Sequence, residues 1–282
     1  MKIRITACLA CLTLFASGDS ASNHMNQIKL MFLDRAGARH PEAKQYMANK
    51  ITEYAASNNI SDEVVSNILI DMIKTSLEAR ASGKNIREFP RGTITYEDSM
   101  LGYLSNYRTT NAMQFLKSMC FSTNKFVRHA ALKGYIRSAK LEALPTLKKC
   151  VQSGQLSESD TYTSYKYFAY EIGQAEAGKQ DSKKIEEAKA FLLERAQEEK
   201  RRSAANELDK ILCGMFPDYA TSVQREKVAT HFMNDDNEIC RRQFMKIHED
   251  IQKAPKEKRK DFSGKGELLD PEREKNKPDA QP

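Results

Sequence analysis

The sequence predicts an all-α protein, a right-handed superhelical α-solenoid built from antiparallel helix pairs. Apolar residues recur with the helical period along most of its 282 residues, and glycine and proline number only 12 and 8. Basic residues recur at intervals of 38, 36 and 39 residues, which is close to one helix–turn–helix unit of a solenoid. These repeat positions are Arg128, Lys166, Arg202 and Arg241. A helical domain without repeats is the alternative interpretation.

The clearest predicted helix runs through residues 122–137. Three residues of the capping type, Ser-Thr-Asn, precede its apolar pattern. That pattern places five residues on one helix face, and these are Val127, Ala130, Ala131, Gly134 and Tyr135. Because the first four are small, we expect another helix to approach this face closely.

Parts of this helix recur further along the chain. Residues 124–128 and 237–241 share a capping asparagine, a charged residue, two apolar residues and an arginine. The segment Ala143-Leu-Pro-Thr-Leu147 resembles the Leu-Pro first helix of a HEAT repeat, and residues 127–131 resemble its Val-Arg-x-x-Ala second helix. The resemblance covers about residues 109–254, and it implies a HEAT/armadillo-like stack of helix pairs.

The resemblance also implies a structural role for repeat-phased arginines. In HEAT repeats, an aspartate six residues before the arginine helps to lock neighbouring repeats together, and Asp235 occupies that position ahead of Arg241. Arg128 and Arg241 each follow an apolar residue at a helix start. A planar guanidinium there can bond to carbonyls or acids at the turn of its own or the next repeat. We therefore expect both arginines to be structural, with Asp235 as the partner of Arg241.

Residues 1–21 are typical of a secretory signal peptide. Lys2 and Arg4 form a basic start, residues 5–16 are apolar, and small residues follow at the expected cleavage positions. The apolar run is too short to span a membrane, and no later segment is suited to span one. The sequence therefore predicts an exported protein, periplasmic or secreted, in a bacterial envelope.

Composition divides the rest of the chain into four parts. Residues 22–83 predict an N-terminal helical hairpin region, and residues 84–95 have no helical period and predict a surface loop. Residues 96–254 predict the HEAT-like helical repeats. Residues 255–282 are nearly all charged and contain prolines, so they predict a disordered tail that buries too little apolar surface to fold.

Capping and helix-breaking residues predict where individual helices begin and end. Pro41 begins a helix at its first turn, and the pair of asparagines at 58–59 ends it. Ser61, followed by two acids, opens the next helix. Residues 181–214 are helical in pattern throughout, with a bend expected near Glu198.

Cysteines at 120, 150, 213 and 240 remain after the predicted signal peptide. Export to an oxidising compartment permits a disulfide bond, and the cysteine spacings match no zinc site. Cys120 and Cys150 lie near the ends of successive first helices, which stack side by side in a solenoid. They are the expected pair, with buried thiols as the alternative.

The sequence contains no recognisable catalytic motif, so we expect no enzyme activity and no cofactor. It lacks His-Glu-x-x-His, Gly-x-Ser-x-Gly and a phosphate-binding glycine loop. The polar run 234–238 lacks the ligand spacing of a calcium loop and predicts a helix cap. Cys240 and His248 are separated by about 12 Å of helical rise, which is too far to share one metal. No metal site is predicted.

A basic stripe is expected on the second helices of the repeats, which line the concave side of a solenoid. It begins with four residues spaced four apart, and the repeat spacing transfers their positions to later helices. The expected partner-binding residues are Lys125, His129, Lys133, Arg137, Tyr167, Arg242 and Lys246. The same transfer also marks Glu171, Ser203 and Glu207, with Tyr162 nearby.

These observations predict a non-enzymatic interaction scaffold that binds a protein partner through its concave helical face. Two alternatives remain open. The basic stripe suits an anionic polymer, either polysaccharide or nucleic acid, although a signal peptide disfavours nucleic acid. An enzyme whose site is assembled between helices is the other alternative. The net charge of +7 is modest for this length and does not decide among them.

Overall fold

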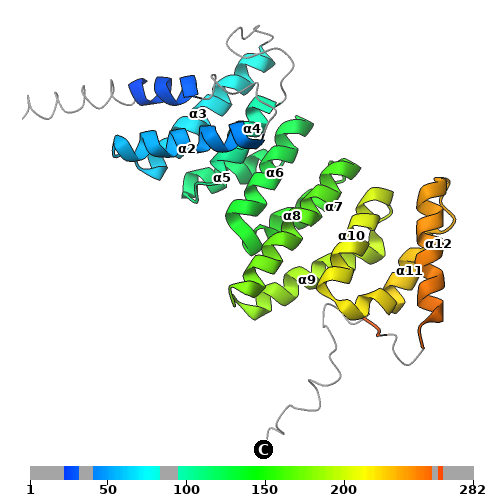
Figure 1. The fold of residues 1–282 in the computed structure, drawn as a ribbon. Helices are drawn as coiled ribbons and strands as arrows, with labels where there is room; N and C mark the ends of the chain where they lie inside the picture. Colours follow the sequence, from blue (N-terminus) through cyan, green and yellow to red (C-terminus); the bar gives the residue numbers. More distant parts are fainter. Residues whose placement is uncertain (1–21, 32–40, 83–94, 256–259, 263–282) are drawn as a thin grey trace, which may run out of the picture. The chain divides into compact units, whose positions relative to one another are not determined.

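The computed structural model describes residues 22–31, 41–82, 95–255 and 260–262, and every regular element in these ranges is a helix (Figure 1). The all-α prediction is therefore confirmed for the described residues. The predicted signal peptide and almost all of the predicted loop at 84–95 lie outside them. The chain divides into two compact units, residues 1–134 and 135–282. This division falls inside a helix, α6 (Lys125–Ala139), and not at the predicted loop.

The first unit contains the helical residues 22–31 and the start of α6, together with α2 (Pro41–Ser57), α3 (Asp62–Ala81), α4 (Thr95–Leu104) and α5 (Thr110–Met119). Helix α3 packs against both α4 and α5. Local sequence sets the helix ends, because Ser61 and Thr109 cap α3 and α5 with their hydroxyls. Asn59 adopts a φ of 53°, which asparagine tolerates better than most residues, so the predicted break after α2 is confirmed.

The apolar face predicted for α6 is buried as expected. Val127, Ala130, Ala131 and Tyr135 are each at most 7 % exposed, and Gly134 is buried beside α4 and α5. A Cβ atom at Gly134 would lie 3.2 Å from the carbonyl oxygen of Leu101 and 3.3 Å from a methyl carbon of Leu116. The close approach of neighbouring helices therefore leaves room for little more than the hydrogen that glycine carries.

The second unit begins with the end of α6 and continues, over its described residues, as a series of six α-helices and two 3₁₀ helices. These are η1 (Lys140–Ala143), α7 (Leu144–Gln152), α8 (Glu158–Ala177), α9 (Ser182–Glu198), α10 (Arg202–Met215), η2 (Pro217–Thr221), α11 (Val223–Phe232) and α12 (Glu238–Lys253). Consecutive helices pack together from α8 to α12. Alternate helices also pack together, since α8 contacts α10 and α9 contacts α11. The helices from α8 to α11 are thus held by neighbours one and two places away in the chain.

The last helix is anchored by a small aromatic core. Phe244 of α12 is fully buried and stacks on Phe232 of α11, with 5.0 Å between ring centroids. Ala205 of α10 and Cys240 of α12 belong to the same cluster. Helix α12 therefore packs on α11 and shares this cluster with α10.

A buried ion pair interrupts the helix predicted over residues 181–214. Glu199 and Arg201 have extended backbone, so α9 and α10 are separate helices and the expectation of one bent helix was wrong. The Glu199 carboxylate accepts from Arg201 Nε at 2.7 Å and from the Tyr165 hydroxyl at 3.3 Å. Arg201 also donates to Thr161 Oγ1 at 2.6 Å. Contacts with α8 therefore override the helix propensity of this charged segment.

A second buried ion pair joins α11 to the elements before it. Arg225 binds the Asp209 carboxylate through two nitrogens, at 2.7 and 3.1 Å, and donates to the Ala220 carbonyl at 2.8 Å. Burial lowers the pKa of Arg225, but Asp209 outweighs it and the net shift is upward. The guanidinium thus links α10, η2 and α11.

All four cysteines predicted to remain after signal cleavage are thiols in the structure, so the expected Cys120–Cys150 disulfide is not formed. The Cys120 thiol instead lies 3.2 Å from the carbonyl oxygen of Leu116 in its own helix. Burial raises the pKa of the Cys213 thiol to about 11. Cys120, Cys150 and Cys240 are buried and Cys213 is half-buried, which agrees with the alternative of buried thiols in all but the full burial of Cys213.

Most of the predicted tail also lies outside the described residues, but Pro255 and residues 260–262 are described. Residues 260–262 contact η2 and α11, so these three residues of the predicted disordered tail lie against the helices. Within the described ranges, no helix is both long enough and apolar enough to cross a bilayer.

Candidate functional site

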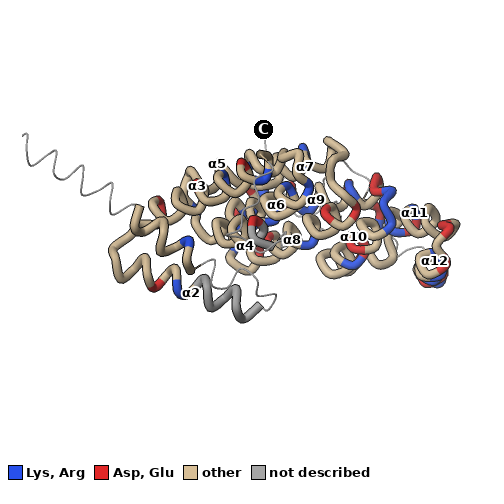
Figure 2. The backbone as a smooth tube through the Cα atoms, turned by 90° about the horizontal axis from the view of Figure 1, so that it is seen from above, with Lys and Arg blue, Asp and Glu red and all other residues tan. Residues whose placement is uncertain are grey.

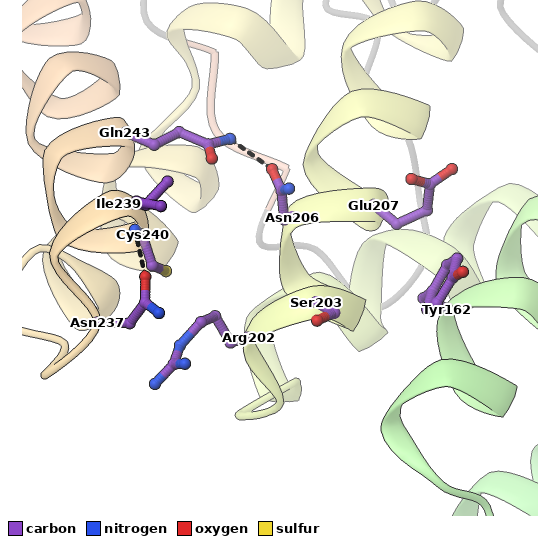
Figure 3. Close-up of a pocket in the computed structure, with 9 residues that line it drawn as sticks. All are labelled: Tyr162, Arg202, Ser203, Asn206, Glu207, Asn237, Ile239, Cys240 and Gln243. Carbon is purple, nitrogen blue, oxygen red and sulfur yellow. Dashed lines mark hydrogen bonds between the residues drawn. The ribbon is translucent and has the colours of Figure 1, made fainter.

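A groove of about 390 Å³ lies between α8, α10 and α12 in the second unit (Figure 3). Its lining residues sit on the first turns of α10 and α12 and on one turn of α8. They are Tyr162, Arg202, Ser203, Asn206, Glu207, Asn237, Ile239, Cys240 and Gln243. The spacing 203, 206, 207 on α10 and 239, 240, 243 on α12 places each set on one face of its helix.

Amide side chains bridge the groove. Gln243 of α12 donates through its Nε2 to the Oδ1 of Asn206 on α10, as the dashed line in Figure 3 shows. Asn237 caps α12 by accepting from the backbone N–H of Cys240 at 3.0 Å. The Asn206–Gln243 bond leaves an amide N–H₂ group on Asn206 and an amide oxygen on Gln243. The groove therefore presents both donors and acceptors.

An ion pair neutralises the one cation of the groove. Arg202 binds the carboxylate of Asp235 at 2.7 Å, and the backbone N–H of Asn237 donates to the same carboxylate at 2.7 Å. The N–H bond first, and the Arg202 guanidinium after it, lower the pKa of Asp235. Burial raises the pKa of the neighbouring Cys240 thiol, which stays protonated near neutral pH. Arg202 is thus already engaged by a carboxylate of the same surface.

Two other lining residues, Glu207 and Tyr162, have polar side-chain groups that remain available to a ligand. Neither the Glu207 side chain nor the Tyr162 side chain forms an ion pair or a hydrogen bond with any residue that the structure describes. Ile239 is 80 % exposed, although aliphatic side chains are usually buried. The groove therefore combines an uncompensated carboxylate, a tyrosine and an exposed aliphatic side chain.

The first unit has a comparable groove of about 560 Å³ between α3 and α5. It is lined by Asn67, Ile70, Asp71, Lys74, Asn111, Gln114, Phe115 and Ser118. Asn111 Nδ2 donates to Asn67 Oδ1 at 3.1 Å, so an amide pair again bridges two helices that lie two places apart in the chain. Here the cation Lys74 lies near the Phe115 ring, at 6.0 Å from its centroid.

The predicted basic stripe is present on α6, but only in part as an exposed surface. Lys125 and Arg137 are exposed, whereas His129 and Lys133 are half-buried and engaged in other interactions. In the second unit the stripe does not continue as predicted. Arg242 binds Glu238 of its own helix, and α12 carries both acidic and basic residues (Figure 2).

The remaining predicted site residues divide between the groove and other surfaces. Ser203, Glu207 and Tyr162 line the groove, whereas Tyr167 and Lys246 do not. Glu171 is buried. Lys166 is exposed, which does not match the structural role expected of a repeat position. Asn206, Gln243 and Ile239 were not among the residues predicted from the sequence. Asn206 lies three residues after Ser203 and Gln243 lies four residues after Ile239, and these helical intervals were the available signal.

The two echoing arginines have different environments. Arg128 is 9 % exposed and donates to the Ser122 carbonyl at 2.7 Å, which is the contact expected at the turn of its own repeat. Arg241 is half-exposed and pairs with no residue that the structure describes. The predicted Arg241–Asp235 pair was wrong, because Asp235 binds Arg202.

We expect these environments to separate the two arginines in stability. Arg128→Ala leaves the Ser122 carbonyl without its donor and should lower the free energy of unfolding by about 1–3 kcal/mol. Arg241→Ala removes a side chain without such a contact and should change it by less than about 0.5 kcal/mol. Urea denaturation followed by circular dichroism measures both. Equal losses for the two variants would contradict these assignments.

Among the described residues, no three histidine, cysteine, aspartate or glutamate side chains are grouped so that they could hold a metal ion. Comparison with known protein families, with curated protein sequences and with solved structures found no match to this chain.

Proposed function

We propose that this chain is an exported interaction scaffold, a right-handed HEAT-like α-solenoid whose groove between α8, α10 and α12 holds an extended segment of a partner protein. The packing of alternate helices in the second unit supports the solenoid. When helix pairs stack, the first helix of one pair contacts the first helix of the next pair, and the second helices do the same. The signal-like residues 1–21 support export. The donors, acceptors and apolar side chains of the groove support binding of an extended protein segment.

The amide pair is the observation that carries the proposal. A peptide backbone offers one N–H and one C=O per residue, and it must satisfy both when it leaves water. Asn206 and Gln243 face each other across the groove and together retain a donor and an acceptor. An extended segment lying between α10 and α12 can bond to both groups irrespective of its side chains.

Side chains beside the amides determine which segment fits. Ile239 and Tyr162 offer apolar surface, so an apolar side chain of the partner would cover them. Glu207 forms no ion pair with the residues that the structure describes, and its carboxylate would attract a lysine or arginine. The segment that best matches this groove therefore carries an apolar residue close to a basic one. This differs from the acidic partner that a basic stripe implies.

A peptide selected from a displayed random library against the full chain tests this proposal. Ile239→Ser should weaken binding of the selected peptide about tenfold, because it removes most of the apolar surface that the peptide covers. Met245→Ser is the matched control, since Met245 is an exposed residue of the same helix outside the groove. Fluorescence anisotropy measures both affinities.

Equal affinities for the wild-type, Ile239→Ser and Met245→Ser chains would contradict the groove as the binding site. The anionic-polymer alternative has a separate signature. Retention on heparin that falls steeply with salt, and that is lost when Lys125 and Arg137 are changed to glutamine, would favour the α6 stripe instead.

A further inference from the structure

Residues 260–262 lie against η2 and the first turn of α11 through polar contacts from each residue. The Val223 backbone N–H donates to the Lys260 carbonyl at 3.4 Å, and the Lys260 ammonium binds Asp218 at 2.6 Å. Gln224 uses both ends of its amide. Its Nε2 donates to Asp261 Oδ1 at 2.6 Å, and its Oε1 accepts from the backbone N–H of residue 262 at 3.0 Å.

An aromatic contact completes the arrangement. The Phe262 ring lies 6.1 Å from the Phe216 ring and 6.4 Å from the Tyr219 ring, between centroids, in tilted orientations. Aromatic rings at these distances attract each other beyond the area they bury. Lys260, Asp261 and Phe262 therefore each meet a different feature of the helical surface.

The receiving surface is built for these contacts. Gln224 is fully buried with the segment in place, and a buried amide must have partners at both its nitrogen and its oxygen. Within the described residues, the hydrogen bonds of its side chain both go to the segment. Gln224 thus recognises one side-chain group and one backbone group of the segment at the same time.

We propose that η2 and the first turn of α11 form a docking site for a peptide of Lys-Asp-Phe type, and that residues 260–262 of the same chain occupy it. Asp218 recognises the basic residue, Gln224 the acidic residue and the backbone after it, and Phe216 with Tyr219 the aromatic residue. The inference rests on these contacts alone and is independent of the groove between α8, α10 and α12.

The site can be tested with the full chain and a labelled peptide that spans residues 256–266. The double variant Asp261→Ala, Phe262→Ala weakens the internal occupant and leaves the receiving surface intact. We expect this variant to bind the peptide saturably, at least tenfold more tightly than the wild-type chain does. In the wild type, the linked segment competes at an effective concentration of roughly millimolar or higher. Asp270→Ala is the control and should behave as wild type.

Charge reversal supplies the specificity test without touching a buried residue. Asp218 is about half exposed, so Asp218→Lys should fold normally. Combined with the double variant, it should bind the peptide about threefold more weakly, a size typical of surface ion pairs. A peptide carrying Lys260→Glu should recover the loss. The proposal is overturned if the double variant fails to bind the peptide, if it binds no more tightly than the wild type, or if the reversed peptide recovers nothing.

Discussion

Replacing Arg225 with alanine should lower the free energy of unfolding by about 3–5 kcal/mol, because it leaves a buried carboxylate without its partner. The Asp209 side chain is only 6 % exposed and accepts hydrogen bonds from two of the guanidinium nitrogens. The Ala220 carbonyl would also lose a donor. Thermal and urea denaturation measure the change.

Two further variants make this prediction specific to the ion pair. Lys227 is an exposed cation of the same helix, so Lys227→Ala should cost less than about 0.5 kcal/mol. The double variant Asp209→Leu, Arg225→Met replaces both charges by apolar groups and should be more stable than Arg225→Ala alone. A double variant as unstable as the single one would show that packing, and not the unpaired charge, accounts for the loss.

The second large effect is expected at Arg201, which holds the extended turn between α9 and α10. Arg201→Ala should cost about 3 kcal/mol, at the low end for a broken buried pair since the arginine itself is 30 % exposed. It leaves the Glu199 carboxylate, 5 % exposed, with the Tyr165 hydroxyl as its remaining side-chain partner. Burial, followed by the Glu199 charge, raises the pKa of Tyr165, so this hydroxyl remains a donor at neutral pH.

The neighbouring Arg242 provides the comparison for Arg201. Its pair with Glu238 lies on the surface of α12, so Arg242→Ala should cost less than about 0.5 kcal/mol. Differential scanning calorimetry of the two variants measures the contrast. If Arg201→Ala is as mild as Arg242→Ala, the turn is held by its helices alone.

Local pattern was enough to predict the helices but not their junctions. The small-residue face of α6 and the break at Asn59 follow from spacing and from backbone preference, which act within a few residues. No glycine or proline lies near Glu199 in the sequence to predict the break there. The break depends on Thr161 and Tyr165 of α8, which lie far away in the sequence. Tertiary contacts of this kind are absent from any local pattern.

The repeat phase was predicted one residue away from the arginine that binds the buried Glu199 carboxylate. Arg202 was the expected structural position, whereas Arg201 turns inward to Glu199 and Thr161 and Arg202 turns outward to Asp235. A shift of one residue rotates a helical position by about 100°, so an interval read from sequence does not decide which of two adjacent arginines turns inward. The same uncertainty led to the incorrect partner for Asp235.

The groove was only partly predictable for a related reason. Ser203 and Glu207 were found by transfer of the stripe, but the amides that bridge α10 and α12 give no distinctive signal in sequence. Asparagine and glutamine are common on exposed helix faces, and only the tertiary placement of α12 brings Asn206 and Gln243 together. Phe244 contributes to that placement by stacking on Phe232 of α11.

Photo-cross-linking from the groove tests the proposed function most directly. A benzophenone amino acid is placed at position 239 or, as a control, at position 245, and each chain is irradiated with the selected peptide. The groove predicts efficient capture of the peptide from position 239, with cross-links to residues of the peptide next to its basic side chain, and little capture from position 245. Equal capture from both positions, or capture from position 245 alone, would contradict binding between α10 and α12.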